Sequence, residues 1–234
     1  MARLPRLYAP GATQLALAEF ADHTTISPFD LTNKTLPLIV NWMGDAAGVY
    51  QVAIHGWSLT PKAILLLATP KDPQGISKLI QSLGRHLASL LKIGSVFSGR
   101  YRSTILEPEV WVLPALIWLE RQSLREQSCT DPELWPWSSV AAHTGAPGLT
   151  PVWLSQHLDY WACGNTPFDR QAVYRKRLHE GNEPAADRII EKALRGQWPL
   201  GGDAFLDDIA PHSSRRVRPA KRGRPKTSTT IAHR

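Results

Sequence analysis

The chain has 234 residues, enough for one core of moderate size plus an appendage, and it carries a formal net charge of +7. Its two cysteines, Cys129 and Cys163, cannot form a zinc site alone and are expected to be free thiols. No apolar run approaches the roughly 20 residues of a spanning helix, and polar residues interrupt the N-terminal segment. A membrane span and a signal peptide are therefore not expected, and a cytoplasmic location is.

The excess positive charge lies in the last residues of the chain. Residues 212–234 hold eight lysines or arginines and no acid, whereas the rest of the chain has 19 bases against 20 acids. A basic tail of this kind attracts a polyanion, usually nucleic acid. The same composition also fits a solvated tail that only aids solubility.

The first half of the chain predicts strands alternating with helices. Apolar patterns predict strands over 13–20, 49–59 and 63–68. Ser27, a suitable N-cap, and Pro28 predict a helix start, and one-sided apolar spacing predicts a helix over 75–92. His55 lies in the second strand without another histidine at ligand spacing, which favours a structural role.

The second half predicts shorter elements. Residues 97–103 indicate a glycine-kinked strand pair, and residues 107–125 indicate a helix. Residues 135–139, Trp-Pro-Trp-Ser-Ser, predict a proline-locked turn that lays two indoles on the core. Further short helices are expected over 151–161, 168–179, 184–194 and 203–209.

Several of these segments resemble the REP-associated (IS200-like) single-tyrosine HUH transposases. The resemblance rests on residues 1–11, the leucine run 65–67, Phe-Ser-Gly-Arg-Tyr-Arg-Ser at 97–103, residues 135–139, and Trp-Pro-Leu-Gly at 198–201. It implies an α+β ferredoxin-like sandwich, an antiparallel sheet with helices on one face. The expected organisation is a transposase domain over 1–144, a helical extension over 145–211 and a disordered basic tail over 212–234.

The resemblance also implies where the family's chemistry would lie. The family's metal strand reads roughly Met-Pro-Asn-His-x-His-Leu-Leu-Leu, and alignment on the leucines places its two histidines at Lys62 and Ile64. The nucleophilic tyrosine falls on Trp118, and Gln122 lies where related enzymes place an amide ligand. Protonated lysine and isoleucine offer a cation no lone pair, and indole has no hydroxyl to attack a phosphate. The family would use Mg²⁺ or Mn²⁺, but no intact catalytic site, metal site or cofactor is predicted here.

DNA binding is predicted at two places. Arg100, Tyr101 and Arg102 offer two guanidiniums for phosphate and a ring face for a base, although Tyr101 fits a core role equally well. The second place is the tail, whose candidate residues are Lys221, Arg222, Arg224 and Lys226. They surround Arg-Gly-Arg-Pro, the core of the AT-hook, which binds A·T-rich minor grooves; nonspecific phosphate binding is the alternative.

Three functions follow from these observations. The leading hypothesis is a catalytically silent transposase relative that binds single-stranded hairpin DNA, A·T-rich duplex DNA or both, in association with the nucleoid. The second is an active single-strand DNA transposase or nuclease with relocated groups. Its candidate nucleophiles are Tyr101 and Tyr160, and its candidate metal ligands are His55 with Glu107 or Glu120. The third is an interaction protein whose acidic body contacts another protein while the tail tethers it to DNA.

Overall fold

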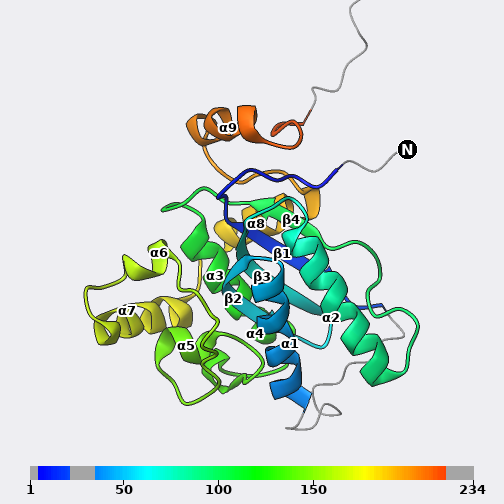
Figure 1. Cartoon of the computed structure of the whole chain (residues 1–234). Helices are drawn as coiled ribbons and strands as arrows, with labels where there is room; N and C mark the ends of the chain where they lie inside the picture. The colour runs from blue at the N-terminus through cyan, green and yellow to red at the C-terminus, as the bar shows by residue number, and fades with distance from the viewer. Residues whose placement is uncertain (1–4, 22–34, 220–234) are drawn as a thin grey trace, which may run out of the picture.

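A four-stranded antiparallel sheet lies between two layers of helices (Figure 1). The computed structural model describes residues 5–21 and 35–219. The strands are β1 (Gln14–Glu19), β2 (Val52–Leu59), β3 (Ala63–Pro70) and β4 (Arg102–Ile105). The helices are α1 (Thr35–Val49), α2 (Gly75–Leu91), α3 (Val112–Glu120), α4 (Gln122–Arg125), α5 (Val140–Thr144), α6 (Leu158–Trp161), α7 (Pro167–Glu180), α8 (Pro184–Gly196) and α9 (Asp203–Ile209). The predicted helix start at Ser27 and Pro28 lies outside the described residues.

The sheet has the strand order β2-β3-β1-β4, with all neighbouring strands antiparallel. In the described residues, α1 lies between β1 and β2 in the chain, and α2 lies between β3 and β4. The resulting β-α-β-β-α-β order is that of a ferredoxin-like sandwich, which confirms the predicted α+β fold class. β1 and β3 are the central strands.

Strand β3 is buried on both faces. Ile64 and Leu66 pack in the core beneath α1 and α2, whereas Leu65 and Leu67 pack in the core beneath α3, α7 and α8. Successive side chains of a strand point to opposite faces, so a strand covered on both sides is apolar at every position. This explains why residues 63–68 form a continuous apolar run.

The sandwich differs from the expectation in its second helical layer. α1 and α2 cover one face as predicted, but the opposite face is covered as well, by α3 with α7 and α8. Leu116 of α3, Leu178 of α7 and Leu194 of α8 are each buried in that second core. Helices of the predicted extension 145–211 therefore complete the sandwich.

Two predicted helices are shorter in the structure. The helix expected over 107–125 starts at Val112, because Glu109 has a positive φ of 62°, and it is interrupted between α3 and α4 at Arg121. Only Leu158–Trp161 is helical within 151–161. The Ser155 amide instead donates to the Ile54 carbonyl of β2, 2.9 Å away.

The predicted strand pair over 97–103 is reduced to β4 and one bridge between Phe20 and Phe97. The two indoles of residues 135–139 do pack on the core, since Trp135 and Trp137 are each 6% exposed. The Trp135 Nε1–H donates to the Leu59 carbonyl at 3.1 Å. That hydrogen bond fastens the turn to the end of β2.

Residues 212–219 belong to the fold, which moves the predicted tail boundary at 212. The Ser214 amide donates to the Tyr8 carbonyl, and the Tyr8 amide donates to Ser214 Oγ; both distances are 2.9 Å. Val217 is buried in a small third core with Leu7 and Ile105. The C-terminal segment thus lies along the N-terminal one.

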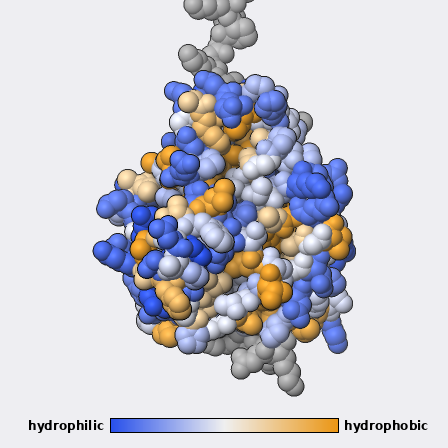
Figure 2. Space-filling view, turned by 60° about the vertical axis from the view of Figure 1, so that its left-hand side comes forward, coloured by the Kyte–Doolittle hydropathy of each residue, from blue (hydrophilic) through white to orange (hydrophobic). Residues whose placement is uncertain are grey.

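The outer surface on the side of α6 and α7 carries separated apolar side chains. In Figure 2, which turns this side forward, apolar spots lie scattered among hydrophilic ones. Leu158, Trp161 and Phe168 are among the exposed large apolar residues. Scattered apolar residues are ordinary on protein surfaces. Among the described residues, no helix is both long and apolar enough for a bilayer.

A chain of hydrogen bonds joins the buried His55 to the partly exposed His157. His55 Nδ1–H donates to the Ser155 carbonyl at 2.6 Å, and His55 Nε2 lies 2.8 Å from Thr69 Oγ1. Thr69 Oγ1 is 2.9 Å from Thr13 Oγ1, which is 3.1 Å from His157 Nε2. Every group in this chain has a matching donor or acceptor when both imidazoles are neutral. Burial favours the neutral forms, since it lowers the pKa of His55 to about 4 and also lowers the pKa of His157.

We expect stability to fall on acidification because of His55. The unfolded chain takes up a proton near pH 6.5 while folded His55 stays neutral to about pH 4, so unfolding is favoured progressively across that window. The full loss of unfolding free energy from this pKa difference is about 3 kcal/mol. Urea unfolding of the wild type and of His55→Gln between pH 7 and pH 4 measures it, and the two curves should converge as the pH falls. Parallel curves would contradict the assignment.

Candidate nucleic-acid interface

A cavity of about 460 Å³ lies where β1 and β3 meet α3, α4 and α8. We call it the cleft. Its lining from the sheet side is Leu17, Glu19, Lys62, Ala63 and Leu65, and from the helices it includes Trp118, Gln122, Glu126 and Asp187. The two strands contribute alternate residues, so the same face of the sheet forms the floor.

The structure brings three of the four positions that the resemblance assigns to the family's chemistry to this cleft. Lys62, Trp118 and Gln122 all line it, but Ile64 does not. Ile64 points to the opposite face, into the core beneath α1 and α2. The positions of β3 that face the cleft are Ala63 and Leu65, and neither side chain can coordinate a cation.

The charged groups of the cleft neutralise one another. Arg125 Nη2 is 2.5 Å from Asp187 Oδ2, and Arg195 Nε is 2.9 Å from Glu191 Oε1. Burial raises the pKa of Glu126, whose Oε1 accepts from the Thr60 hydroxyl at 3.1 Å. Its Oε2 is buried and has no hydrogen-bond partner among the described residues. Lys62 and Arg188 also line the cleft, and its four basic side chains are balanced in number by four acidic ones.

The side chains of the cleft do not fit a divalent cation of the kind the resemblance implies. Mg²⁺ and Mn²⁺ take several oxygen ligands in regular geometry. In the described part of the chain, no group of three or more His, Cys, Asp or Glu side chains is placed to hold a metal ion. Glu19 lies beside Arg102 and Gln122 offers a single amide. Among the described residues that line the cleft, there is also no tyrosine, serine, threonine or cysteine to act as a nucleophile.

Of the alternative catalytic residues, the structure brings Glu120 and Tyr160 into one buried cluster through His143, and there they serve as hydrogen-bonding groups of the core. The fully buried Glu120 carboxylate accepts from Ser139 Oγ at 2.6 Å, His143 Nδ1 at 2.7 Å and Tyr174 OH at 2.7 Å. Tyr160 donates to the His143 carbonyl at 2.9 Å. These contacts tie α3 to α5, α6 and α7.

The remaining alternative ligands are engaged in other contacts. Both His55 nitrogens bond to Ser155 and Thr69, and Glu107 Oε2 accepts from the Gly202 amide at 2.8 Å. Burial raises the pKa of Tyr160 to about 12, which disfavours the phenolate. Relocated metal and nucleophile sites therefore find no support in the described residues.

A second cavity, of about 420 Å³, lies beside the cleft and collects arginines. We call it the arginine pocket. Its lining includes Arg100, Arg102, Arg215, Gln197 and Glu19. Glu19 lines both cavities, and its Oε2 lies 3.6 Å from Arg102 Nη2. The pocket thus joins the 98–102 segment to the C-terminal segment.

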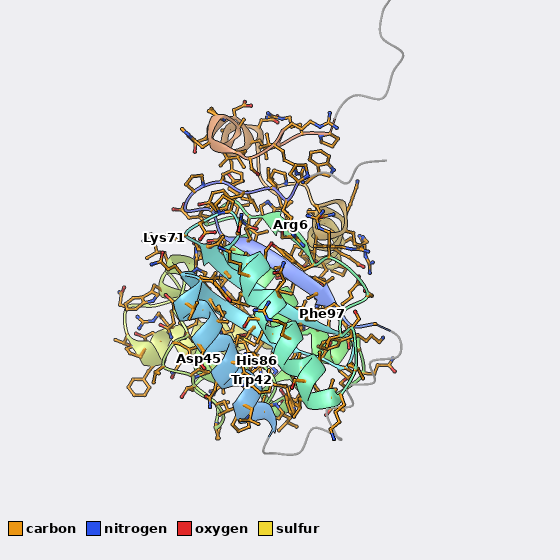
Figure 3. All side chains as sticks on the ribbon, turned by 45° about the vertical axis from the view of Figure 1, so that its right-hand side comes forward. Arg6, Trp42, Asp45, Lys71, His86 and Phe97 are labelled. Carbon is orange, nitrogen blue, oxygen red and sulfur yellow. The ribbon has the colours of Figure 1, made fainter. Side chains whose placement is uncertain are left out.

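Two arginines stack on aromatic rings at this pocket. The Arg6 guanidinium lies 3.8 Å from the Tyr101 ring centroid, and the Arg215 guanidinium lies 4.6 Å from that of Trp198. Arg6 Nη1 also donates to Ser77 Oγ, in the first turn of α2, and Figure 3 shows Arg6 near that end of the helix. Sequence reasoning missed Arg6, Arg215 and Trp198 as a group because their segments are far apart in the chain.

Tyr101 is a core residue and not a base-stacking platform. It is 6% exposed, its ring carries Arg6, and its OH lies 3.3 Å from Ser77 Oγ. Burial raises its pKa. Of the predicted strand grip, Arg100 is exposed and Arg102 is half-buried against Glu19. The tail candidates lie outside the described residues: Lys221, Arg222, Arg224 and Lys226.

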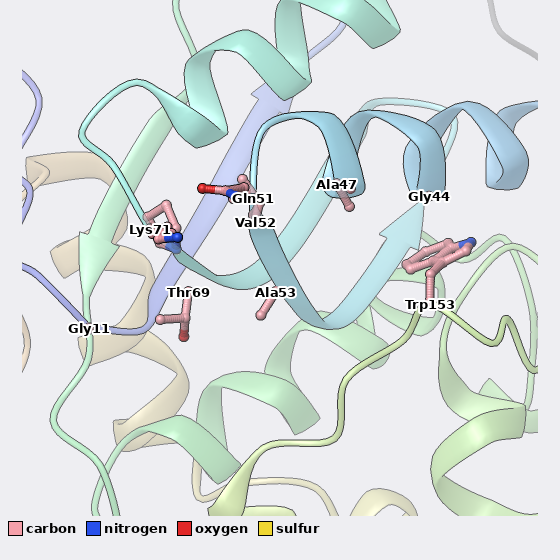
Figure 4. Close-up of a pocket in the computed structure, with 11 residues that line it drawn as sticks. Gly11, Gly44, Ala47, Gln51, Val52, Ala53, Thr69, Lys71 and Trp153 are labelled. Atoms are coloured by element: carbon pink, nitrogen blue, oxygen red, sulfur yellow. The ribbon is translucent and has the colours of Figure 1, made fainter.

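A third cavity, of about 560 Å³, lies apart from these sites at the C-terminal end of α1 (Figure 4). Trp153 lies against Gly44, where an added Cβ would come within 2.3 Å of the ring. Lys71 is the one charged side chain in its described lining. This shallow apolar surface offers no convergent chemistry and none of the predicted site residues.

The burial of Tyr101 predicts that its substitutions act on stability. Tyr101→Ala should cost roughly 3–5 kcal/mol of unfolding free energy, as aromatic truncations in cores do. Tyr101→Phe should cost much less and leave DNA affinity unchanged, since its ring packing is kept. Chemical unfolding and fluorescence anisotropy with a single strand test both. A large loss of affinity for Tyr101→Phe with intact stability would show a direct role for the hydroxyl.

Comparisons with known proteins place the fold. No protein-family model and no curated protein matches the sequence. A solved REP-associated tyrosine transposase bound to a REP hairpin matches with a TM-score of 0.52 and 12% identity, over 68% of this chain and 93% of that chain. A proposed transposase from Deinococcus radiodurans R1 matches more weakly, with a TM-score of 0.35 and 12% identity, over 54% of this chain and 94% of that chain. The chain therefore has the fold of a REP-associated tyrosine transposase, as the resemblance in the sequence predicted.

Proposed function

We propose that this chain is a DNA-binding protein of the transposase type that does not cut or join strands. The observation that carries the proposal is the make-up of the cleft, where Trp118 shares the cavity with Ala63 and Leu65. By the sequence resemblance, Trp118 occupies the position of the family's nucleophilic tyrosine.

The chemistry of strand transfer explains why these residues matter. Cleavage through a covalent intermediate needs an oxygen nucleophile and a cation that stabilises the developing charge on the phosphate. An indole supplies no such nucleophile, and the aliphatic side chains of β3 supply no ligand. Substitution at both kinds of position removes attack and electrophilic activation together.

DNA binding is supported independently of cleavage. The solved relative of the same fold was determined with a REP hairpin. This chain adds exposed Arg100 and the basic residues beyond 219. We therefore propose hairpin or single-stranded DNA as the partner of the folded body, and A·T-rich duplex DNA as a second partner of the AT-hook-like tail, consistent with a place on the nucleoid.

A covalent-adduct assay tests the absence of cleavage. The full chain is incubated with labelled single-stranded hairpin DNA and Mg²⁺ or Mn²⁺, and the products are separated under denaturing conditions. We expect neither a protein–DNA adduct nor a shortened strand. An active single-tyrosine transposase with its own hairpin serves as the control for the assay, and a metal-dependent adduct with this chain would overturn the proposal.

Removal of residues 220–234 tests where DNA binds. This truncation is preferred to one at 212, because 212–219 pack on the body. Affinity should fall and the salt slope on single strands should decrease by roughly 0.7 for each lost phosphate contact. Part of the hairpin affinity should persist. Loss of all DNA affinity would instead favour the third hypothesis, an interaction protein that only its tail tethers to DNA.

A further inference from the structure

The arginine pocket holds more positive charge than its acids can balance. Arg100, Arg102 and Arg215 line it, and Glu19 is the one acid in its described lining. Arg216 lies close by, with its guanidinium 5.9 Å from the Trp198 ring centroid. The cleft next door, by contrast, is lined by as many acids as bases, and two of its arginines, Arg125 and Arg195, pair with carboxylates.

One of these arginines, Arg215, and the neighbouring Arg6 are held in place before any ligand arrives. Arg215 stacks on Trp198 and donates from Nη2 to the Gln197 carbonyl. Burial lowers the pKa of Arg215, and the charge of Arg216 lowers it further. Burial also lowers the pKa of Arg6, a shift that Tyr101 opposes and the charge of Arg100 assists. Crowded, partly buried guanidiniums without acids favour an incoming anion, and their fixed positions reduce the entropy lost on binding it.

The single acid of the pocket holds its arginine loosely. Glu19 Oε2 is 3.6 Å from Arg102 Nη2, beyond the 2.7–2.9 Å that is typical of a charge-assisted hydrogen bond, and both side chains are 37% exposed. Such an exposed pair contributes little free energy. A phosphate, which accepts bidentate hydrogen bonds from arginine, is a stronger partner.

We propose that the arginine pocket binds one backbone phosphate of a single-stranded nucleic acid, and that Glu19 competes with this phosphate for Arg102. The inference rests on the proposed DNA binding and names the folded part of its site. The Tyr101 ring is buried beneath Arg6, and Trp198 carries Arg215. The pocket therefore recognises the phosphate and not the base.

Two charge changes in the full-length chain test the proposal. Arg100→Ala is compared with Arg177→Ala, an exposed arginine on α7. Glu19→Gln is compared with Glu180→Gln, whose carboxylate is exposed and pairs only loosely with Lys176, at 3.9 Å. Each comparison holds the net charge constant. Anisotropy with a labelled single strand gives the affinity at several salt concentrations, and urea unfolding verifies the fold of every variant.

The expected results differ in sign. Arg100→Ala should weaken binding several-fold and reduce the salt slope by about 0.7, whereas Arg177→Ala should not. Glu19→Gln should tighten binding several-fold, a gain that misfolding cannot imitate, whereas Glu180→Gln should change it little. An unlabelled abasic strand should compete as well as a normal strand of equal length. Inorganic phosphate should compete only weakly, because it is a single anion.

The opposite results separate the two proposals. If the wild type binds but each pocket variant behaves as its control, the pocket assignment is overturned while DNA binding stands. If the normal strand competes about tenfold better than the abasic strand or more, the pocket reads bases, and the proposed phosphate recognition is overturned. If the wild type binds no DNA, both the proposed function and this inference fail.

Discussion

Strand β3 must satisfy two cores at once, and this constraint decides which side chains it can carry. Ile64 and Leu66 belong to the core beneath α1 and α2, and Leu65 belongs to the core beneath α3, α7 and α8. A polar ligand on the second face has to replace a packed aliphatic group, since every position of the strand is covered. Here Ala63 and Leu65 occupy that face at the floor of the cleft, and neither side chain offers a ligand to a cation.

The second helical layer follows from the same constraint. With aliphatic residues on that face of the sheet, α3, α7 and α8 have a surface against which to bury Leu116, Leu178 and Leu194. The Glu120 carboxylate then joins α3 to α5 and α7, through three donors in a fully buried position. A buried carboxylate that has all its partners stabilises a fixed arrangement. Glu120 is thus a structural group of the helical layer.

Local pattern could predict the strands, the long amphipathic α2 and the Trp-Pro-Trp turn, because each depends on neighbours in the sequence. Contacts from distant segments decided the rest. The 151–157 segment is not helical and instead forms hydrogen bonds with β2. The Tyr101 ring is covered by Arg6, which is far away in the sequence. Ile64 faces the core beneath α1 and α2, whereas its neighbours Ala63 and Leu65 face the cleft. A shift of one residue exchanges the two faces of a strand, and an alignment on three consecutive leucines does not fix which face each position takes.

The distribution of charge between the two neighbouring cavities bears most directly on function. A strand-cutting site concentrates positive charge at the scissile phosphate. In this chain four basic and four acidic side chains line the cleft, whereas the described lining of the arginine pocket has three arginines and one acid. Glu19 lines both cavities, and its carboxylate lies 3.6 Å from Arg102 of the arginine pocket. Under the proposed function, a phosphate binds beside the cleft instead of in it, and the strand is held where none of the described residues is placed to break it.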